Sequence, residues 1–226
     1  MEDVGVVRRN PPRADKAVVD AFAQFGVATV HEAQGRSGVL AAYMRPIYKG
    51  AHIAGSAVTV GVPPGDNWMI HVAVEQCSDG DVLVVAPTEP CEHGYFGELL
   101  ATAVQHRGVR GLVIEAGVRD IAELERMQFP AWSKHVSSLG TVKERLGTVN
   151  GAIEIAGVRV EPGDVVVADD DGVVVVQRGH AEEVLDASTK REQKEAQSRK
   201  RYAAGELSLD VSKMRDDLER KGLRYE

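Results

Sequence analysis

The segment 94–120, GYFGELLATAVQHRGVRGLVIEAGVRD, constrains the fold more than any other part of the chain, because it predicts a loop, a helix, a turn and a strand in succession. Its first four residues, GYFG, include two glycines and are typical of a sharply bent loop. Apolar residues recur at helical spacing from Glu98 to His106, and Gly108 is expected to end this helix. The apolar run 112–114 then predicts a strand that is covered on both faces.

Arg119 and Asp120 follow that strand, at the edge where open α/β sheets bind ligands. Arginine presents a planar fork to an anion, and aspartate is a ligand for hard cations. The N–H groups near Gly97, Glu98 and Leu99 begin the preceding helix without helical partners, so they too can hold an anion. We therefore expect a small anionic substrate bridged to a divalent cation at this edge.

A structural alternative fits the same spacing. Aspartate is a favoured N-cap, so Asp120 can instead cap a helix over 121–127 while Arg119 remains solvated. The two interpretations differ in whether the Asp120 carboxylate contacts a helix N–H group or a ligand, and the sequence leaves both open.

Helical and strand-like segments alternate through the rest of the first half of the chain, which predicts an α/β domain. Strong turn signals, such as VPPGDN at 62–67 and SDGD at 78–81, separate them. The expected elements are helices at 14–25 and 29–33, a connecting loop at 38–48, a strand at 53–60, a helix beginning at Asn67, a strand at 82–86, a helix at 121–127 and a short strand at 129–132.

Short apolar strands separated by turns follow at 153–160, 165–168 and 173–177, and they predict a second β layer on the same core. The turn DDDG at 169–172 places three carboxylates before a glycine. It lacks the spacing and the distal glutamate of a calcium-binding EF-hand loop, so a hairpin turn is favoured over a metal loop.

The C-terminal part, 180–204, predicts a long helix that is rich in charged residues and poor in apolar ones. Such a helix is solvated or packs on a neighbouring subunit. Glu192 and Glu195 lie three apart on one face, and spacing alone favours ion pairs with nearby lysines and arginines. After Gly205, a loop and a short amphipathic segment form a tail that needs a partner surface.

Composition and motifs narrow the function. A net charge of −7 argues against broad nucleic-acid binding. No apolar run approaches the roughly 20 residues of a membrane helix, and the N-terminus lacks a signal-peptide apolar region, so we expect a cytoplasmic protein that binds neither nucleic acid nor membrane. Cys77 and Cys91 lack metal-like spacing and are expected to be reduced thiols. Zinc, nucleophile-elbow and Walker motifs are absent from the sequence.

The length of 226 residues suits one domain with appendages. We expect an N-terminal arm with helices over 1–35, a catalytic core over 36–178, and a C-terminal helix and tail over 179–226. No linker-like composition separates these parts, so they are expected to form a single domain.

Five stretches of the chain form a recognisable set: PPGDNW, GELLATAVQHRGVRGLVIEAGVRD, SSLGTVKERLGTVN, PGDVVVADDDGVVVV and GLRYE. Together they resemble the class II pyruvate aldolases, which act on 4-hydroxy-4-methyl-2-oxoglutarate and 4-carboxy-4-hydroxy-2-oxoadipate and share a fold with the regulator of ribonuclease E activity A. The resemblance runs from about Arg36 to the C-terminus. It implies an α/β/β sandwich of the swivelling-domain type, assembled as a homotrimer or homohexamer, with active sites between subunits and the long C-terminal helix packed on a neighbour.

The resemblance also implies a divalent metal, Mg²⁺ or Mn²⁺. By matching positions, Asp120 would be its direct protein ligand and Glu98 would hold a metal-bound water. Glu195 of a neighbouring subunit would hold another such water. Many relatives have aspartate where this chain has Glu98, which is one methylene longer and carries the same charge.

For the substrate, the resemblance assigns Arg119 to the pyruvyl group and to the enolate that forms from it. The N–H groups of Leu99 and Leu100 would receive the substrate carboxylate. Asn67 and Lys143 match positions that line the pocket.

The implied reaction is a retro-aldol cleavage. A 4-hydroxy-2-oxo acid loses its C4 hydroxyl proton to a metal-linked water or a water held by Glu98, the C3–C4 bond breaks, and pyruvate leaves through an enolate. Oxaloacetate decarboxylation passes through the same enolate and is expected as a side activity. Two alternatives stay open: a non-catalytic regulator that binds a protein partner, and a different lyase or hydrolase acting on another 2-oxo acid.

Overall fold

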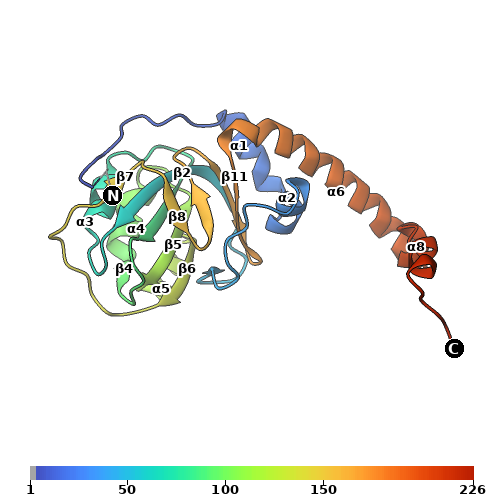
Figure 1. Cartoon of the computed structure of the whole chain (residues 1–226). Helices are drawn as coiled ribbons and strands as arrows, with labels where there is room; N and C mark the ends of the chain where they lie inside the picture. Colours follow the sequence, from blue (N-terminus) through green and yellow to red (C-terminus); the bar gives the residue numbers. More distant parts are fainter. Residues whose placement is uncertain (1–3) are drawn as a thin grey trace.

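A nine-stranded mixed sheet forms the centre of the molecule (Figure 1), and the computed structural model describes residues 4–226 of the chain. The strands follow the order β1-β6-β5-β3-β2-β10-β11, with β4 paired to β5 and β7 paired to β2. A separate two-stranded sheet consists of β8 and β9. The strands are β1 (Arg45–Pro46), β2 (Ile53–Val62), β3 (Asp81–Pro87), β4 (Gly94–Phe96), β5 (Gly111–Val118), β6 (Ala131–Val136), β7 (Thr148–Val149), β8 (Ile153–Ile155), β9 (Val158–Val160), β10 (Val165–Asp169) and β11 (Gly172–Val176).

The parallel strands β2, β3, β5 and β6 make up the middle of this sheet. Every residue of β2 is buried, as expected of a strand covered on both faces, and its sequence IAGSAVTVGV contains no charged residue. The sheet is nearly closed, because the edge carrying β1 approaches β11. Val39 forms an isolated bridge to Val174, and the Arg45 guanidinium donates to the carbonyl of Asp171 at 2.6 Å.

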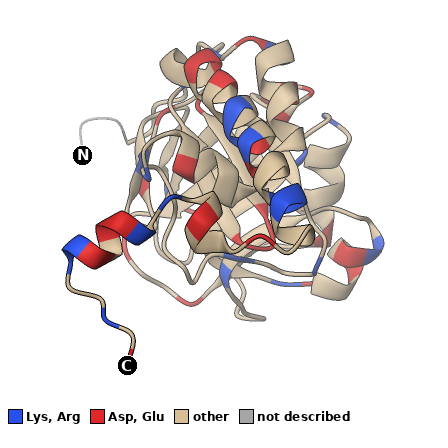
Figure 2. Ribbon diagram, turned by 90° about the vertical axis from the view of Figure 1, so that its right-hand side faces the viewer, with Lys and Arg blue, Asp and Glu red and all other residues tan. Residues whose placement is uncertain are grey.

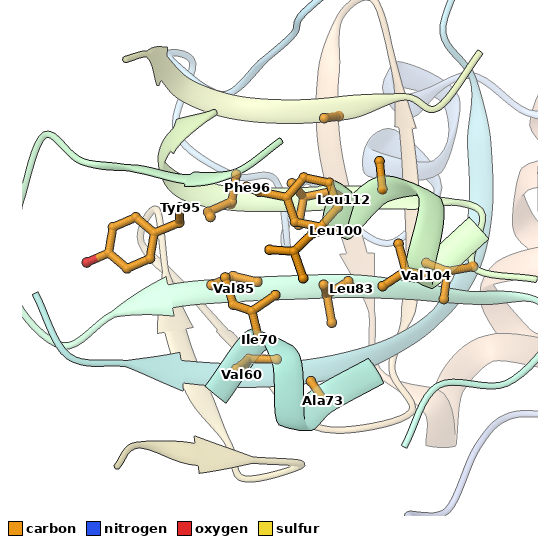
Figure 3. Packing of buried hydrophobic residues seen from close by; sticks show 14 of the residues in the cluster. Val60, Ile70, Ala73, Leu83, Val85, Tyr95, Phe96, Leu100, Val104 and Leu112 are labelled. Atoms are coloured by element: carbon orange, nitrogen blue, oxygen red, sulfur yellow. The ribbon is translucent and has the colours of Figure 1, made fainter. Parts of the chain in front are cut away.

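The helices cover the sheet in two groups. One face is covered by α3 and α4, which enclose the apolar cluster in Figure 3. A different group, α1, α2 and the start of α6, packs against β10 and β11. The helical segments are α1 (Lys16–Ala21), η1 (Phe22–Gln24), α2 (Val27–Ala33), α3 (Trp68–Val74), α4 (Glu98–Gln105), α5 (Ile121–Arg126), η2 (Arg178–His180), α6 (Ala181–Ala203), α7 (Ser208–Val211) and α8 (Arg215–Arg220).

Three sequence-based expectations need correction. GYFG was expected to be a loop, but Gly94–Phe96 is strand β4, because its backbone pairs in parallel with β5. The expected loop at 38–48 contains the two-residue strand β1. The expected second β layer holds only for the pairing of β8 with β9, since β10 is hydrogen-bonded to β2 and carries β11 into the main sheet.

The DDDG segment is a hairpin turn between β10 and β11, as the sequence favours. Its carboxylates are used by the backbone, because Asp169 accepts the N–H of Val27 at 2.8 Å and Asp170 accepts the N–H of Gly50 at 2.9 Å. The turn therefore binds the first residue of α2 and the loop at Gly50 to the sheet.

Helix α6 extends away from the body of the molecule and carries α7 and α8 at its far end (Figure 1). Its 23 residues span about 35 Å. Only Ala181, Val184 and Ser188 are buried, all in the first three turns, and charged residues of both signs lie along the remainder (Figure 2). Among the described residues, no helix has the length and apolarity to cross a membrane.

Candidate active site

The pairing of β4 with β5 builds the candidate site. Phe96 lies opposite Val118, and the N–H of Arg119 donates to the carbonyl of Phe96 at 2.9 Å. Because β4 leads directly into α4, this pairing sets the start of α4 beside the end of β5. The two halves of the predicted site, which are about twenty residues apart in the sequence, are thus held together by backbone hydrogen bonds.

Asp120 has a left-handed backbone, with φ of 56° and ψ of 36°. Its Oδ2 accepts the N–H of Glu98 at 3.0 Å and lies 3.8 Å from Nε of Arg119. Within residues 4–226, Oδ1 accepts no hydrogen bond, and 42% of the side chain is exposed. One carboxylate oxygen is therefore available to a ligand.

The capping alternative for Asp120 is wrong as stated. Asp120 stands at the N-cap position of α5, yet its side chain makes no hydrogen bond to that helix. It bonds instead to the first turn of α4, where a carboxylate is stabilised by the positive end of the helix dipole.

Gly97 is needed at the start of α4 because it has no side chain. Its φ of −154° is ordinary extended backbone. A Cβ at this position would press on Oδ2 of Asp120 and lie 3.0 Å from Cγ of Arg119. Any larger residue would therefore displace the two side chains that the sequence places at the site.

Two backbone donors at the start of α4 have no partner within residues 4–226. The first helical bond runs from the N–H of Ala101 to the carbonyl of Gly97, so the N–H groups of Leu99 and Leu100 precede it. The sequence also assigns the Glu98 N–H to an anion, but Asp120 already uses that group. Leu99 is 80% exposed beside these donors. The Glu98 carboxylate accepts a hydrogen bond from the Thr102 hydroxyl at 3.2 Å.

Asn67 lies on the other side of β4, at the start of α3. Its Nδ2 donates to the carbonyl of Tyr95 at 2.9 Å. Its Oδ1 is buried and has no partner among the described residues, and the side chain does not cap α3. A buried acceptor without a partner costs about 1–3 kcal/mol, so this oxygen is a candidate to accept a hydrogen bond from a ligand.

Lys143 is exposed in the loop formed by residues 141–146, which lies against the Asn67 turn. The N–H of Asn67 donates to the carbonyl of Val142 at 3.1 Å, and the N–H of Val142 donates to the carbonyl of Gly65 at 2.9 Å. Burial lowers the pKa of His71 on α3, and the positive charge of Lys143 lowers it further. The structure thus brings Lys143 and Asn67 together.

Glu195 does not join these residues within one chain. It lies on α6, which extends from the side of the molecule opposite α3 and β4 (Figure 1). Nε of Arg191 lies 2.8 Å from the Glu195 carboxylate, and the same guanidinium lies 3.6 Å from Glu32 of α2. The ion pairing expected from spacing is confirmed, while the role of Glu195 at a neighbouring subunit stays a prediction.

A family model described as "RraA-like: Aldolase/RraA" matches residues 16–175. The chain belongs to this RraA-like family. A relative from Halalkalibacterium halodurans carries the provisional name 4-hydroxy-4-methyl-2-oxoglutarate aldolase; it is 30% identical over 153 residues, which are 68% of this chain and 73% of the relative.

Solved structures of other proteins share the fold. An uncharacterised protein from Pseudomonas syringae has a TM-score of 0.81 at 23% identity, covering 90% of this chain and 96% of that one. RraAS2 of Streptomyces coelicolor, an unusual member of the RNase ES inhibitor RraA family, has a TM-score of 0.74 at 28% identity, covering 84% and 98%. The RraA-like name therefore spans proteins described as aldolases and as ribonuclease inhibitors.

Sequence reasoning overlooked Asp66 and Tyr95. Asp66 is completely buried and accepts three backbone N–H groups. The Tyr95 hydroxyl accepts the N–H of Gly65 at 2.6 Å and donates to the carbonyl of Pro63 at 3.0 Å, and in Figure 3 it points away from the apolar cluster. The position of Asp66 just before a predicted helix indicates that its carboxylate can bond to the start of that helix. No local pattern around GYF indicates that the Tyr95 hydroxyl binds the distant turn at 63–65.

Other polar features lie apart from the candidate site. A cavity of about 700 Å³ lies between α2, β9, β11 and α6, and its lining includes Arg159, His180 and Glu183. Among residues 4–226, no group of three or more His, Cys, Asp or Glu side chains is arranged to hold a metal. A cation at Asp120 would therefore depend on water, substrate or another chain for its remaining ligands.

Proposed function

We propose that this chain is a divalent-metal-dependent carbon–carbon lyase of the class II pyruvate aldolase type. Its substrates would be 4-hydroxy-2-oxo acids such as 4-hydroxy-4-methyl-2-oxoglutarate and 4-carboxy-4-hydroxy-2-oxoadipate. The products are pyruvate plus a second 2-oxo acid, and oxaloacetate decarboxylation is the side activity. The observation that carries this proposal is the half-exposed Asp120 carboxylate, which has one free oxygen and lies beside Arg119 at the start of α4.

The donor set fits a hard cation. Mg²⁺ prefers oxygen ligands, keeps several waters and is commonly bound through one or two carboxylates together with substrate. Asp120 would be the direct ligand, and Glu98, whose N–H donates to the Asp120 carboxylate, would hold a water in the same sphere. A bound Mg²⁺ or Mn²⁺ would supply Lewis acidity toward the carboxylate and keto oxygens of the substrate.

The remaining groups bind and orient the substrate. The N–H groups of Leu99 and Leu100 point from the start of α4 and would receive the C1 carboxylate. The Arg119 guanidinium would donate to the C2 oxygen, on which negative charge develops as the C3–C4 bond breaks. Asn67 Oδ1 and Lys143 would contact the distal part of the substrate.

Proton movements complete the cleavage. A water held by the Glu98 carboxylate would take the proton of the C4 hydroxyl, so that C4 becomes a carbonyl and the bonding pair passes to the pyruvyl fragment. Arg119 would stabilise the resulting enolate, and protonation at C3 releases pyruvate.

A neighbouring copy would complete the site. Large apolar side chains next to the candidate residues are exposed in the single chain, which is typical of a surface that another protein covers. We propose a homotrimer or homohexamer with the α/β/β arrangement of swivelling domains, in which α6 packs on a neighbour and Glu195 faces Asp120 of that neighbour. The exposed apolar residues are Trp68, Leu99, Ile121, Val136, Leu139 and Val142.

The test measures pyruvate release from a panel of 4-hydroxy-2-oxo acids and from oxaloacetate, with Mg²⁺ or Mn²⁺ and with EDTA. We expect activity that EDTA abolishes. Arg119→Ala should lose at least about 100-fold in kcat/KM, because it removes the donor at the developing charge. Arg126→Ala is the matched control, since this arginine is also exposed and, among the described residues, pairs only with Glu123 at 3.9 Å.

The likeness to RraAS2 supports one alternative, a non-catalytic protein that binds a ribonuclease. Wild-type protein that binds metal, stays folded and turns over no member of the panel would favour this alternative. Activity that survives EDTA would instead contradict the metal-dependent part of the proposal.

A further inference from the structure

Asp66 is the most completely buried carboxylate near the candidate site, with 0% of the residue exposed. Its Oδ1 accepts the N–H of Trp68 at 3.0 Å, in the first turn of α3. Its Oδ2 accepts the N–H groups of Glu144 at 2.7 Å and Arg145 at 2.8 Å. One side chain thereby joins the start of a helix to a loop that is 78 residues further along the sequence.

The loop attached in this way carries Lys143. Asp66 also forms an isolated parallel bridge with Val142, and the Arg145 guanidinium donates to the carbonyl of Pro64. Lys143 is therefore flanked on both sides by residues whose backbone is bound to the turn at 64–67. Its own ammonium group forms no ion pair within residues 4–226.

We propose that Asp66 is a positioning residue that assembles Asn67 and Lys143 into one preformed half of the substrate site; this inference rests on the function proposed above. Asn67 adjoins Asp66 in the sequence and presents a buried oxygen without a partner. Lys143 presents a free positive charge from the docked loop. Together they supply an acceptor and a cation, which suit the hydroxyl and the carboxylate at the distal end of a 4-hydroxy-2-oxo dicarboxylic acid.

The charge state of Asp66 agrees with this role. Burial alone would raise its pKa, but the N–H groups of Trp68, Glu144 and Arg145 and the charge of Arg145 outweigh that effect and lower the pKa. The carboxylate is therefore ionised at neutral pH, where each N–H donor forms a charge-assisted bond. A neutral amide in its place offers one acceptor oxygen instead of two.

Asp66→Asn tests the proposal against Asp164→Asn. Asp164 is also buried, and it accepts the N–H groups of Glu161 at 2.9 Å and Arg178 at 3.0 Å, in the turn before β10. Both substitutions replace a buried carboxyl group that accepts two or more backbone N–H groups, but only Asp66 is attached to the Lys143 loop. The first measurement is the rate of trypsin cleavage after Lys143 and Arg145, which requires no activity.

We expect Asp66→Asn to accelerate this cleavage about tenfold or more, because the loop loses two of its backbone bonds, and Asp164→Asn to leave it within about twofold of wild type. Unchanged cleavage in Asp66→Asn would overturn the proposal even if the enzyme is active. Accelerated cleavage in a protein that turns over no substrate would instead support loop positioning and contradict the proposed function.

The second measurement is steady-state kinetics of a double-mutant cycle. We expect Asp66→Asn to raise KM about tenfold for a 4-hydroxy-2-oxo dicarboxylic acid, with a smaller change in kcat. If Asp66 acts through Lys143, adding Asp66→Asn to Lys143→Met should cost less than about threefold. Fully multiplicative losses would show that Asp66 acts independently of Lys143 and would overturn the proposal.

Discussion

The starts of α3 and α4 make an informative pair. Each helix begins at the same edge of the sheet, and each has an aspartate carboxylate bonded to its first turn. Asp66 accepts the N–H of Trp68, the first residue of α3, from two positions earlier in the sequence, and it is completely buried. Asp120 serves α4 from 22 residues away and is nearly half exposed.

The two carboxylates differ in how fully the backbone uses them. Both oxygens of Asp66 accept N–H groups, three in total, and the residue is completely buried, so it is closed to a ligand. Asp120 uses one oxygen for a single N–H and keeps the other free. Burial and complete hydrogen bonding thus mark the aspartate that stabilises the structure, whereas partial use marks the aspartate that can bind a cation.

The largest expected effect comes from Asp120→Asn. The amide oxygen can still accept the N–H of Glu98, so the free energy of unfolding should change by less than about 1 kcal/mol. Loss of the negative charge should lower kcat/KM for pyruvate release about a thousandfold, since a ligand of a catalytic cation contributes several kcal/mol. Kinetics and urea unfolding of the same preparation check both expectations.

The outcome for Asp120→Asn can break the comparison in two ways. A large loss of stability would mean that Asp120 is structural, as Asp66 is. Substantial remaining activity together with wild-type affinity for Mn²⁺ would mean that the free oxygen of Asp120 is not a metal ligand.

Gly97→Ala should have the next largest effect. Its Cβ would press on the Asp120 carboxylate and on Arg119, which must both move. We expect a loss of about 1–3 kcal/mol in unfolding free energy, as for other overpacked positions, and a fall of about 100-fold in kcat/KM. Gly140→Ala is the control, because a Cβ there would meet no atom within 4 Å. Equal activity of the two variants would contradict the arrangement at the start of α4.

The sequence predicts the core of this region because its signals are local. The apolar spacing of α4, the apolar run of β5 and the position of Arg119 and Asp120 after that strand all depend on neighbouring residues. The rule that ligands bind at the C-terminal edge of a sheet then suffices to select these two side chains as candidates.

The contacts that complete the candidate site could not be predicted in this way. GYF forms β4 because β5 offers it a partner, and its glycines alone indicate a bend. The bond from Glu98 to Asp120 and the docking of the Lys143 loop on Asp66 join residues that are 22 and 78 positions apart. Such contacts depend on topology, which local periodicity does not encode.

A smaller effect is expected on the pH dependence of the unfolding free energy, measured as the difference between wild type and Asp66→Asn. Because the pKa of Asp66 is lowered in the folded protein, its ionised form stabilises the fold at pH values above the unfolded pKa of about 3.9. That contribution is lost as the pH falls through the lower folded pKa. Asp66→Asn should therefore be about 1–3 kcal/mol less stable than wild type at pH 7, and this difference should shrink below about pH 4.

Urea unfolding of both proteins at pH 7, 5 and 3.5 measures this difference directly. If the stability difference between the two proteins is the same at every pH, the substitution acts through the shape of the side chain and not through its charge. The contrast between Asp66 and Asp120 would then not depend on charge.

The smallest effect is expected from Thr102→Ala, which tests whether the exposed residues of α4 are positioned by hydrogen bonds. The Thr102 hydroxyl donates to Glu98 at 3.2 Å, and both groups lie at the surface of α4. Hydrogen bonds in such positions contribute little, so the unfolding free energy should change by less than about 0.5 kcal/mol. Activity should stay within about threefold, because the Glu98 carboxylate remains free to hold a water. A tenfold loss in kcat with unchanged stability would instead mean that Thr102 orients Glu98 for proton transfer. The side chains at the start of α4 would then be held in position as those at the start of α3 are.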